Sequence, residues 1–187
     1  MFGGVILYGP PASGKDTITA ALTTLDARYA YFHKLKARPG RSMGYRLTTS
    51  EDIAELRRRD AVLYESSRYD ATYVVDAPHL AELRDAGRIP IVHMGQLAGV
   101  EALQTGSVRW LDVLVWCSRE TSEKRLQERG SVDIDRRLRA WGETLADLGP
   151  DGRECFTLAV RTDALSARAV ASAIHAAVLS SQIDAVE

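Results

Sequence analysis

Short apolar runs alternate along the chain with segments in which apolar residues recur every three or four positions. The first run, residues 5–8, is rich in β-forming residues and is bounded by Gly-Gly and Gly-Pro-Pro, which predicts a buried strand. After Lys15 the apolar residues Ile18, Leu22 and Leu25 follow helical spacing. Further strands are predicted at 30–33, 89–94, 113–117 and 156–160, and further helices at 50–58, 78–86, 96–104, 119–128, 133–147 and 165–179.

Strands that alternate with helices are typical of a mostly parallel sheet covered by helices on both faces, so the predicted fold class is α/β. Two segments interrupt the alternation. Residues 34–73 are polar and rich in Arg and Tyr, with a Pro-Gly turn at 39–40 and one short helix, and residues 127–137 form a charged joint that contains Gly130. We interpret both segments as insertions beside the sheet within a single domain.

The chain has 187 residues, of which 45% are hydrophobic, and this is enough for one domain but too few for two. Its 24 Lys and Arg against 25 Asp and Glu give a net charge of -1, which argues against a general nucleic-acid binder and a polybasic membrane adaptor. No apolar run approaches the roughly 18 residues of a membrane span, and Cys117 and Cys155 form no paired motif. We expect a soluble cytoplasmic monomer or homodimer without nucleic-acid or membrane partners.

The segment between the first predicted strand and the first predicted helix has the Gly-x4-Gly-Lys pattern of a phosphate-binding loop. Its backbone N–H groups would surround the phosphates of a nucleotide, and the N-terminus of the following helix would add the positive end of its dipole. Lys15 would contact the β- and γ-phosphates. The residues assigned to ATP are Gly9, Pro10, Pro11, Ala12, Ser13, Gly14, Lys15, Asp16 and Thr17.

The residue after Lys15 departs from the usual pattern, because Asp16 stands where Ser or Thr is expected. The Asp16 carboxylate could contact Mg²⁺ directly or through water, Thr17 could supply the hydroxyl instead, or Asp16 could simply be favoured by the helix dipole. We expect Mg²⁺ to be held mainly by the nucleotide phosphates and water.

Features outside the loop favour a kinase over a nucleotide hydrolase. The strands 89–94 and 113–117 do not end in an Asp that would hold Mg²⁺, whereas cations gather in two clusters, as expected for a small-molecule phosphotransferase. The first cluster contains Lys34, Lys36, Arg38, Arg41 and Arg46, with Tyr45, and the second contains Arg119, Arg125, Arg129, Arg136, Arg137 and Arg139. Solvated or ion-paired surface charge is the alternative interpretation of both.

On these motifs the chain resembles the guanylate kinase family of P-loop nucleoside monophosphate kinases. The resemblance rests on the phosphate loop, on Arg38-Pro39-Gly40 followed by Tyr45, on the stretch Lys-Arg-Leu-Gln-Glu-Arg-Gly at 124–130, and on Arg136-Arg137-Leu138. It implies a P-loop NTPase-type three-layer sandwich with a five-stranded core, at 1–33, 74–126 and 138–187. It also implies an acceptor-binding insertion at 34–73 and a small lid at 127–137.

The same resemblance implies roles for individual residues. Lys15, Arg125, Arg129 and Arg137 would brace the transferring phosphoryl group, and Arg161 and Thr162 would lie near the adenine of ATP. Arg38 and Tyr45 would hold the acceptor phosphate, with Lys34 or Lys36 in place of a further arginine. Glu65, His93 and Gln96 are the remaining candidates for contact with the acceptor, and Tyr64 is an equally placed alternative to Glu65.

The guanylate kinase family recognises guanine with carboxylates, one of them after the middle strand. This chain departs from the family there, because residues 93–96 contain no carboxylate. A related branch, ribose 1,5-bisphosphate phosphokinase, shares Gly-Lys-Asp and also lacks those acids. The sequence therefore predicts an ATP- and Mg²⁺-dependent phosphotransferase that acts on a phosphate-bearing small molecule, most simply a nucleoside monophosphate. Its alternatives are that branch, a biosynthetic kinase for an unusual nucleotide or sugar phosphate, and a non-catalytic binding module. If the acceptor group were a hydroxyl, His93 or Asp70 would be the candidate base.

Overall fold

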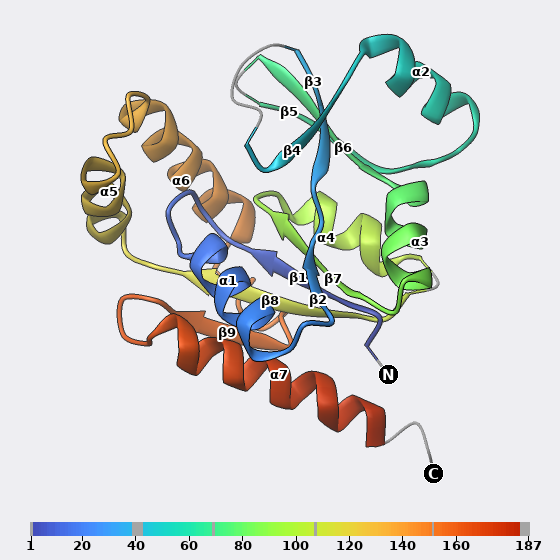
Figure 1. The fold of residues 1–187 in the computed structure, drawn as a ribbon. Coiled ribbons are helices and arrows are strands. Elements are labelled where there is room, and N and C mark those ends of the chain that lie inside the picture. The colour runs from blue at the N-terminus through green and yellow to red at the C-terminus, as the bar shows by residue number, and fades with distance from the viewer. Residues whose placement is uncertain (1, 39–42, 69, 107, 151, 184–187) are drawn as a thin grey trace.

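The computed structural model describes residues 2–38, 43–68, 70–106, 108–150 and 152–183. Its main sheet has five parallel strands in the order β2-β7-β1-β8-β9 (Figure 1). These strands are β1 (Gly4–Tyr8), β2 (Tyr29–Tyr31), β7 (Ile89–Met94), β8 (Trp110–Trp116) and β9 (Leu158–Arg161). The predicted five-stranded parallel sheet is confirmed, with strand ends that differ from the predicted ones by a few residues.

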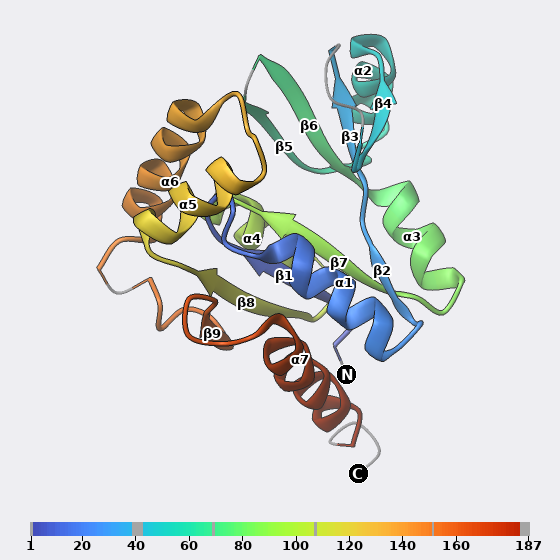
Figure 2. The same cartoon turned by 60° about the vertical axis from the view of Figure 1, so that its left-hand side comes forward.

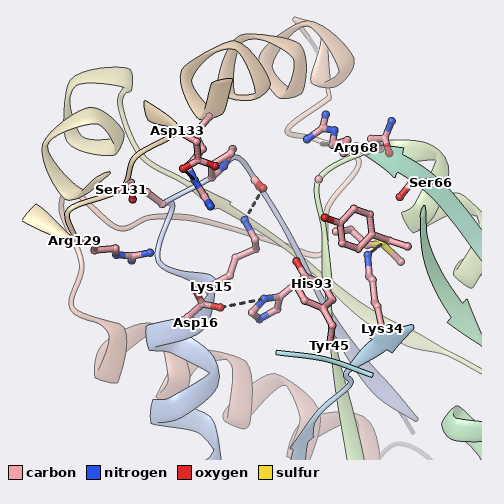
Figure 3. A pocket seen from close by; sticks show the side chains of 18 of the residues that line it. Lys15, Asp16, Lys34, Tyr45, Ser66, Arg68, His93, Arg129, Ser131 and Asp133 are labelled. Carbon is pink, nitrogen blue, oxygen red and sulfur yellow. Dashed lines mark hydrogen bonds and ion pairs between the residues drawn. The ribbon is translucent and has the colours of Figure 1, made fainter. Parts of the chain in front are cut away.

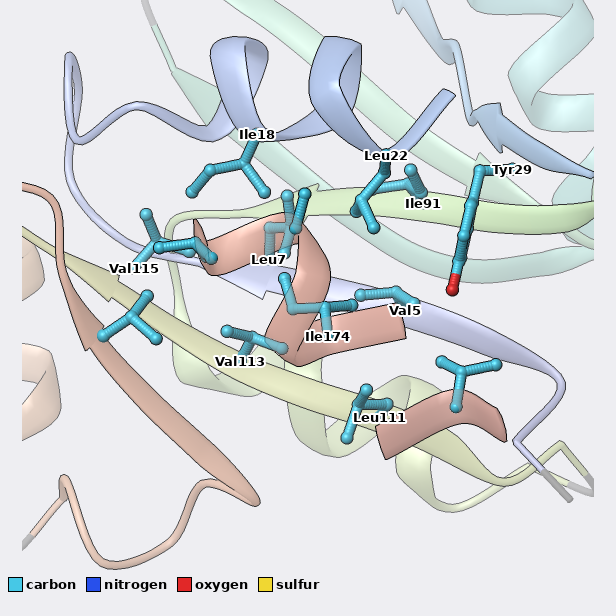
Figure 4. Close-up of a cluster of buried hydrophobic side chains, with 14 of the residues drawn as sticks. Val5, Leu7, Ile18, Leu22, Tyr29, Ile91, Leu111, Val113, Val115 and Ile174 are labelled. Carbon is cyan, nitrogen blue, oxygen red and sulfur yellow. The ribbon is translucent and has the colours of Figure 1, made fainter. Parts of the chain in front are cut away.

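Helices cover both faces of the main sheet, as the predicted three-layer sandwich requires. One face carries α1 (Lys15–Leu25) and α7 (Ala167–Ile183), and the other carries α3 (Ala77–Asp85), α4 (Leu97–Gln104) and α6 (Ile134–Leu148). Successive β1 residues point to opposite faces. Val5 and Leu7 pack in the cluster under α1 and α7 (Figure 4), whereas Ile6 and Tyr8 pack in the other cluster. Both faces are buried, which explains the uninterrupted apolar run of β1.

A second, four-stranded sheet stands above one end of the main sheet, in the order β4-β3-β6-β5 (Figure 1). It comprises β3 (Lys34–Ala37), β4 (Tyr45–Thr48), β5 (Val62–Arg68) and β6 (Ala71–Asp76), with α2 (Ser50–Arg58) packed against it. The pattern at 34–73 predicted only the helix. The strands were missed because their apolar residues are few. The small apolar cluster that stabilises them comes from three separate elements and contains Leu35, Ala37, Ile53 and Val74.

The helix α5 (Arg119–Glu128) follows β8, and residues 129–133 join it to α6. Figure 2 shows α5 and α6 on one side and the second sheet on the other, with the carboxyl end of β1 between them. Pro39, Gly40, Arg41 and Tyr69 lie outside the described residues. Within the described part of the chain, every helix is too short or too polar to cross a membrane.

Candidate active site

A cavity of about 730 Å³ lies at the carboxyl ends of β1 and β7, between the second sheet and the segment after α5 (Figure 3). It is lined by Gly9, Pro11, Ala12, Lys15, Asp16, Tyr31, Lys34, Tyr45, Tyr64, Ser66, Arg68, Tyr73, His93, Met94, Gly95, Gln96, Arg129, Gly130, Ser131, Val132, Asp133 and Arg137. Open α/β sheets bind ligands outside the carboxyl ends of their strands, and this volume suits a small molecule.

The loop between β1 and α1 forms one end of the cavity. Its conformation requires glycine at Gly9, where an added Cβ would lie 2.0 Å from the backbone oxygen of Val115. Gly14, the N-cap of α1, has φ +101 and offers no side chain to cap the helix. The first N–H groups of a helix have no partner within it, so this uncapped N-terminus points donors at the cavity.

Arg125, on α5, holds the loop from behind. Its Nη1 donates to the backbone oxygen of Ala12 at 3.1 Å and to Thr162 Oγ1 at 3.0 Å, and its Nη2 donates to the Thr162 carbonyl at 2.7 Å. Thr162 Oγ1 in turn donates to the Ser13 carbonyl at 2.7 Å. Arg125 is not among the residues that line the cavity, although Ala12, whose carbonyl it binds, is. These contacts favour a positioning role for Arg125 and give no support to the expectation that it braces the transferring phosphoryl group.

Lys15 closes over the loop from the cavity side. Its Nζ donates to the backbone oxygens of Gly9 at 2.6 Å and Pro10 at 2.7 Å. Burial lowers the pKa of Lys15 to about 8, with Arg68 and Arg129 adding repulsion. An anion that enters this end of the cavity would restore the charge of Lys15, because an opposite charge raises the pKa of an ammonium group.

His93 lies at the end of β7, between the two ends of the cavity. Its Nε2 is 2.8 Å from Thr19 Oγ1, and its Nδ1 is 3.6 Å from the carboxylate of Asp16, which is itself exposed. Burial, then Lys15 and Lys34, keep the pKa of His93 well below its usual value. The imidazole is therefore neutral near pH 7, and the Asp16 contact is not an ion pair.

The second sheet forms the other end of the cavity. Lys34 Nζ lies 3.4 Å from Met94 Sδ, and burial with repulsion from Lys15 and Arg68 lowers the pKa of Lys34 to about 7. The rings of Tyr45 and Tyr73 line the cavity with their centroids 5.2 Å apart.

Lys36 lies outside the cavity lining. Its Nζ lies 5.7 Å from the ring centroid of Tyr45 and 6.0 Å from that of Tyr73. It therefore supports the two rings, and of the two lysines predicted to face the acceptor, only Lys34 lines the cavity.

The chain was compared with known proteins. It resembles the crystal structure of guanylate kinase from Anaplasma phagocytophilum with a TM-score of 0.66 at 15% identity, over 97% of this chain and 87% of that one. It resembles shikimate kinase from Acinetobacter baumannii in complex with shikimate with a TM-score of 0.50 at 16% identity, over 97% and 95%. This chain shares the fold of these two structures. No protein-family model matches the sequence, and no curated protein matches it significantly.

Within this fold, β5 places Arg68 in the cavity. Tyr64, Ser66 and Arg68 alternate along the strand and all line the cavity. Sequence reasoning missed Arg68 because it belongs to neither cation cluster; the alternation of Tyr64, Ser66 and Arg68 was the signal available. Glu65 faces the opposite way and binds Arg57 of α2, with N–O distances of 2.6 and 3.0 Å. The expectation that Glu65 contacts the acceptor therefore gains no support from its placement, whereas its alternative, Tyr64, lines the cavity.

We expect the Glu65→Gln variant to keep the acceptor KM of the unmodified protein. The Glu65–Arg57 pair is partly exposed, so its loss should lower the free energy of unfolding by less than about 1 kcal/mol. Steady-state kinetics and thermal unfolding check both expectations. An acceptor KM raised by about ten-fold or more would return Glu65 to the acceptor site.

Several other predicted residues lie away from the cavity. Arg38 is exposed and outside the lining. Arg161 binds Asp163 at 2.8 and 3.1 Å on the surface. Arg46 binds Asp76 and the His33 carbonyl instead of facing a ligand. The proposed contacts of Arg38 with the acceptor and of Arg161 with adenine therefore gain no support from these placements.

Two of the predicted lid arginines do line the cavity. Arg129 lies across from Lys15 in Figure 3, and Arg137 Nε donates to Asp133 Oδ1 at 2.7 Å. Arg136 instead binds Asp70 at 2.9 Å, and Arg119 lies 3.8 Å from Glu123. Of the second cluster, Arg129 and Arg137 are the members that share the cavity with Lys15.

The donor set around the loop fits Mg²⁺ only together with a nucleotide. The described residues contain no group of three or more His, Cys, Asp or Glu side chains that could hold a metal. Asp16 lines the cavity with an exposed carboxylate, whereas Thr17 is exposed and lies outside the lining. One carboxylate plus phosphate oxygens is a usual Mg²⁺ arrangement, so Asp16 suits the metal better than Thr17.

Proposed function

We propose that this protein is an ATP-dependent phosphotransferase that moves the γ-phosphoryl group to a phosphate-bearing small molecule, most simply a nucleoside monophosphate. The observation that carries the proposal is that one cavity joins the phosphate loop and Lys15 at one end to Lys34, Tyr45 and Tyr73 at the other. A donor and an acceptor could thus meet in a single space, as phosphoryl transfer requires.

At the donor end, the N–H groups of the loop would hold the β- and γ-phosphates, with Lys15 released from the carbonyls of Gly9 and Pro10. Arg129 and Arg137 would then face the transferring group. Charge spreads over the equatorial oxygens in the loose transition state, so fixed cations provide most of the catalysis. Asp16 would hold Mg²⁺, which supplies further neutralisation of the phosphates when bound.

At the acceptor end, Lys34 and the hydroxyl of Tyr45 would hold the acceptor phosphate in line with the donor. A phosphate oxygen needs no general base to attack, which agrees with an end of the cavity that offers cations. For a hydroxyl acceptor, neutral His93 is the remaining candidate base, because Asp70 binds Arg136 and lies outside the cavity lining.

Residues 127–137 are proposed to act as a lid over this reaction. Gly130, Ser131 and Val132 line the cavity, while the side chain of Val132 remains fully exposed. Movement of this segment toward the loop would bury Val132, bring Arg129 to the phosphates and exclude water from the transfer.

A coupled assay of ADP release tests the proposal over the common nucleoside monophosphates, ribose 1,5-bisphosphate and other sugar phosphates. Acceptor-dependent ADP release with at least one of them is expected. Calorimetry with ATP and Mg²⁺ addresses the alternative of a non-catalytic module, which predicts no heat from nucleotide binding. ATP binding without transfer to any acceptor would contradict the proposal.

The acceptor KM should rise by about ten-fold as the pH is raised from about 7 to about 8.5, with ATP saturating. The pKa of Lys34 is lowered to about 7, so this ammonium loses its proton over that range and its attraction for a phosphate is lost. The acceptor phosphate itself gains little further charge over that range, since its second pKa is about 6.

Lys34→Arg is the matched variant for this profile, because arginine keeps its charge throughout the range. Its acceptor KM should be nearly independent of pH. A profile that is flat in the unmodified protein, or equally steep in Lys34→Arg, would separate Lys34 from the binding of the acceptor.

A further inference from the structure

Gln96, which follows β7 and is the N-cap of α4, is oriented by a residue of the second sheet. Tyr64 Oη donates to Gln96 Oε1 at 2.9 Å. A glutamine amide has one oxygen, which accepts, and one NH₂ group, which donates. The bond from Tyr64 therefore directs the oxygen to the tyrosine and Nε2 away from it. The Gln96 side chain makes no capping bond to α4, and Tyr64 and Gln96 both line the cavity.

The charged side chains beside Gln96 are donors as well. Lys34 and Arg68 lie on the side of the cavity away from Arg129 (Figure 3), and Arg68 Nη1 is 3.5 Å from the position of a Cβ on Gly95, the residue before Gln96. Asp16 and Asp133, the carboxylates that line the cavity in the described part of the chain, lie on the side of the phosphate loop. A ligand group beside Gln96 therefore meets hydrogen-bond donors.

The carboxylates that line the cavity next to Gln96 already have partners. Gln96 and Arg68 also line an adjoining cavity of about 540 Å³, together with Glu143 and Asp147. Glu143 Oε2 accepts from Arg68 Nη2 at 3.2 Å, and Asp147 Oδ2 accepts from the Leu97 N–H at 2.6 Å and from Tyr8 at 3.2 Å. Because those carboxylates are already paired, a ligand on this side of the cavity would contact Gln96 Nε2 and Arg68.

We propose that Tyr64 and Gln96 set the specificity of the acceptor end, and that they select an acceptor whose distal group presents oxygen lone pairs over one that presents N–H donors. The inference rests on the proposed function, because it concerns the acceptor of the same site. A ligand N–H placed against Gln96 Nε2 would leave two donors facing each other. The mismatch should cost about ten-fold or more in affinity.

The test measures dissociation constants by calorimetry, with ADP and Mg²⁺ present, for pairs of ligands that differ at one group. Xanthosine and guanosine monophosphates differ by a carbonyl oxygen against an amino group, and uridine and cytidine monophosphates differ in the same way. The comparison of fructose 1,6-bisphosphate with fructose 6-phosphate tests whether the oxygen lone pairs that the site prefers belong to a second phosphate group. The oxygen-bearing member should bind about ten-fold tighter in at least one pair, and the pair with the largest ratio identifies the source of the oxygens.

Three variants connect the preference to Gln96. Gln96→Glu replaces the donor by an acceptor and should remove or reverse the ratio within the nucleotide pairs. Gln96→Met removes the donor without adding a charge near Asp147, and Tyr64→Phe frees the amide to turn; both should bring the ratios close to one. Gln104→Glu makes the same chemical change at the exposed far end of α4 and should keep the ratios of the unmodified protein.

Equal affinities within every pair, tighter binding of the N–H-bearing members, binding of none of them, or ratios that Gln96→Glu leaves unchanged would each overturn this inference. The proposed function fails on a different result, which is the absence of phosphoryl transfer to any acceptor in the ADP-release screen. Circular dichroism of each variant shows whether a lost preference accompanies a folded protein.

Discussion

Lys15→Ala is expected to lower the rate of phosphoryl transfer by about two orders of magnitude or more, which is the scale of removing one preorganised charge from a transition state. Lys15 is the cation whose Nζ already lies against the loop, 2.6 Å from the Gly9 carbonyl. Coupled ADP release with a responsive acceptor measures the effect, and circular dichroism checks the fold.

The fold should survive this substitution. Burial lowers the pKa of Lys15 to about 8 from its ordinary 10.5, so the folded state binds this proton less tightly than the unfolded state does. Below about pH 8 the buried charge therefore opposes folding, and its removal should leave the melting temperature unchanged or raised.

Lys124→Ala is the matched control for Lys15→Ala. Lys124 is exposed on α5, with its Nζ 4.0 Å from Glu128, and lies outside the cavity lining. This variant should keep full activity. Turnover in Lys15→Ala comparable to that of the unmodified protein would refute the assignment of the active site.

Arg125→Ala is expected to raise the KM for ATP by about 30-fold, with a smaller effect on kcat. The side chain donates to the backbone oxygens of Ala12 and Thr162, and charge-assisted bonds of this kind contribute about 2 kcal/mol. Their loss should loosen the phosphate loop before ATP binds, and the melting temperature should fall by several degrees.

Arg119→Ala is the matched control on the same helix, because Arg119 is exposed and lies 3.8 Å from Glu123. It should leave both the KM for ATP and the melting temperature unchanged. If Arg125 instead acted on the transferring phosphoryl group, Arg125→Ala would lower kcat at an unchanged KM for ATP. Arg125→Lys separates the two roles further, since lysine keeps the charge but cannot bind two carbonyls with a planar fork.

The phosphate loop and the main sheet were predictable from the sequence because both are encoded locally. A strand buried on both faces is an unbroken apolar run, as in residues 5–8, and glycine is required where the chain adopts backbone angles or approaches that a Cβ forbids, as at Gly9. The helical spacing of the apolar residues after Lys15 predicted the helix that follows the phosphate loop. These features need no information about distant residues.

The sequence did not predict on which face of β5 each side chain lies. The pairing of β5 with β6 shifts register between Val62 and Tyr64, and such an irregularity changes which side chains share a face. Val62 consequently packs with Ile53 in the cluster under α2, whereas Tyr64 packs toward the main sheet. Glu65 therefore faces α2, and Arg68 reaches the cavity.

The sequence by itself determined the parallel core and the position of the phosphate loop, because these depend on periodicity and on backbone freedom within a few residues. Only the tertiary structure decided that Arg125 donates to the backbone of the loop, that Lys34 rather than Lys36 lines the cavity, and that Gln96 accepts a hydrogen bond from Tyr64. Each of these depends on a partner far along the chain, Thr162 for Arg125, Met94 for Lys34 and Tyr64 for Gln96. The direction of a polar side chain is set by the groups that satisfy its hydrogen bonds, and folding chooses those groups.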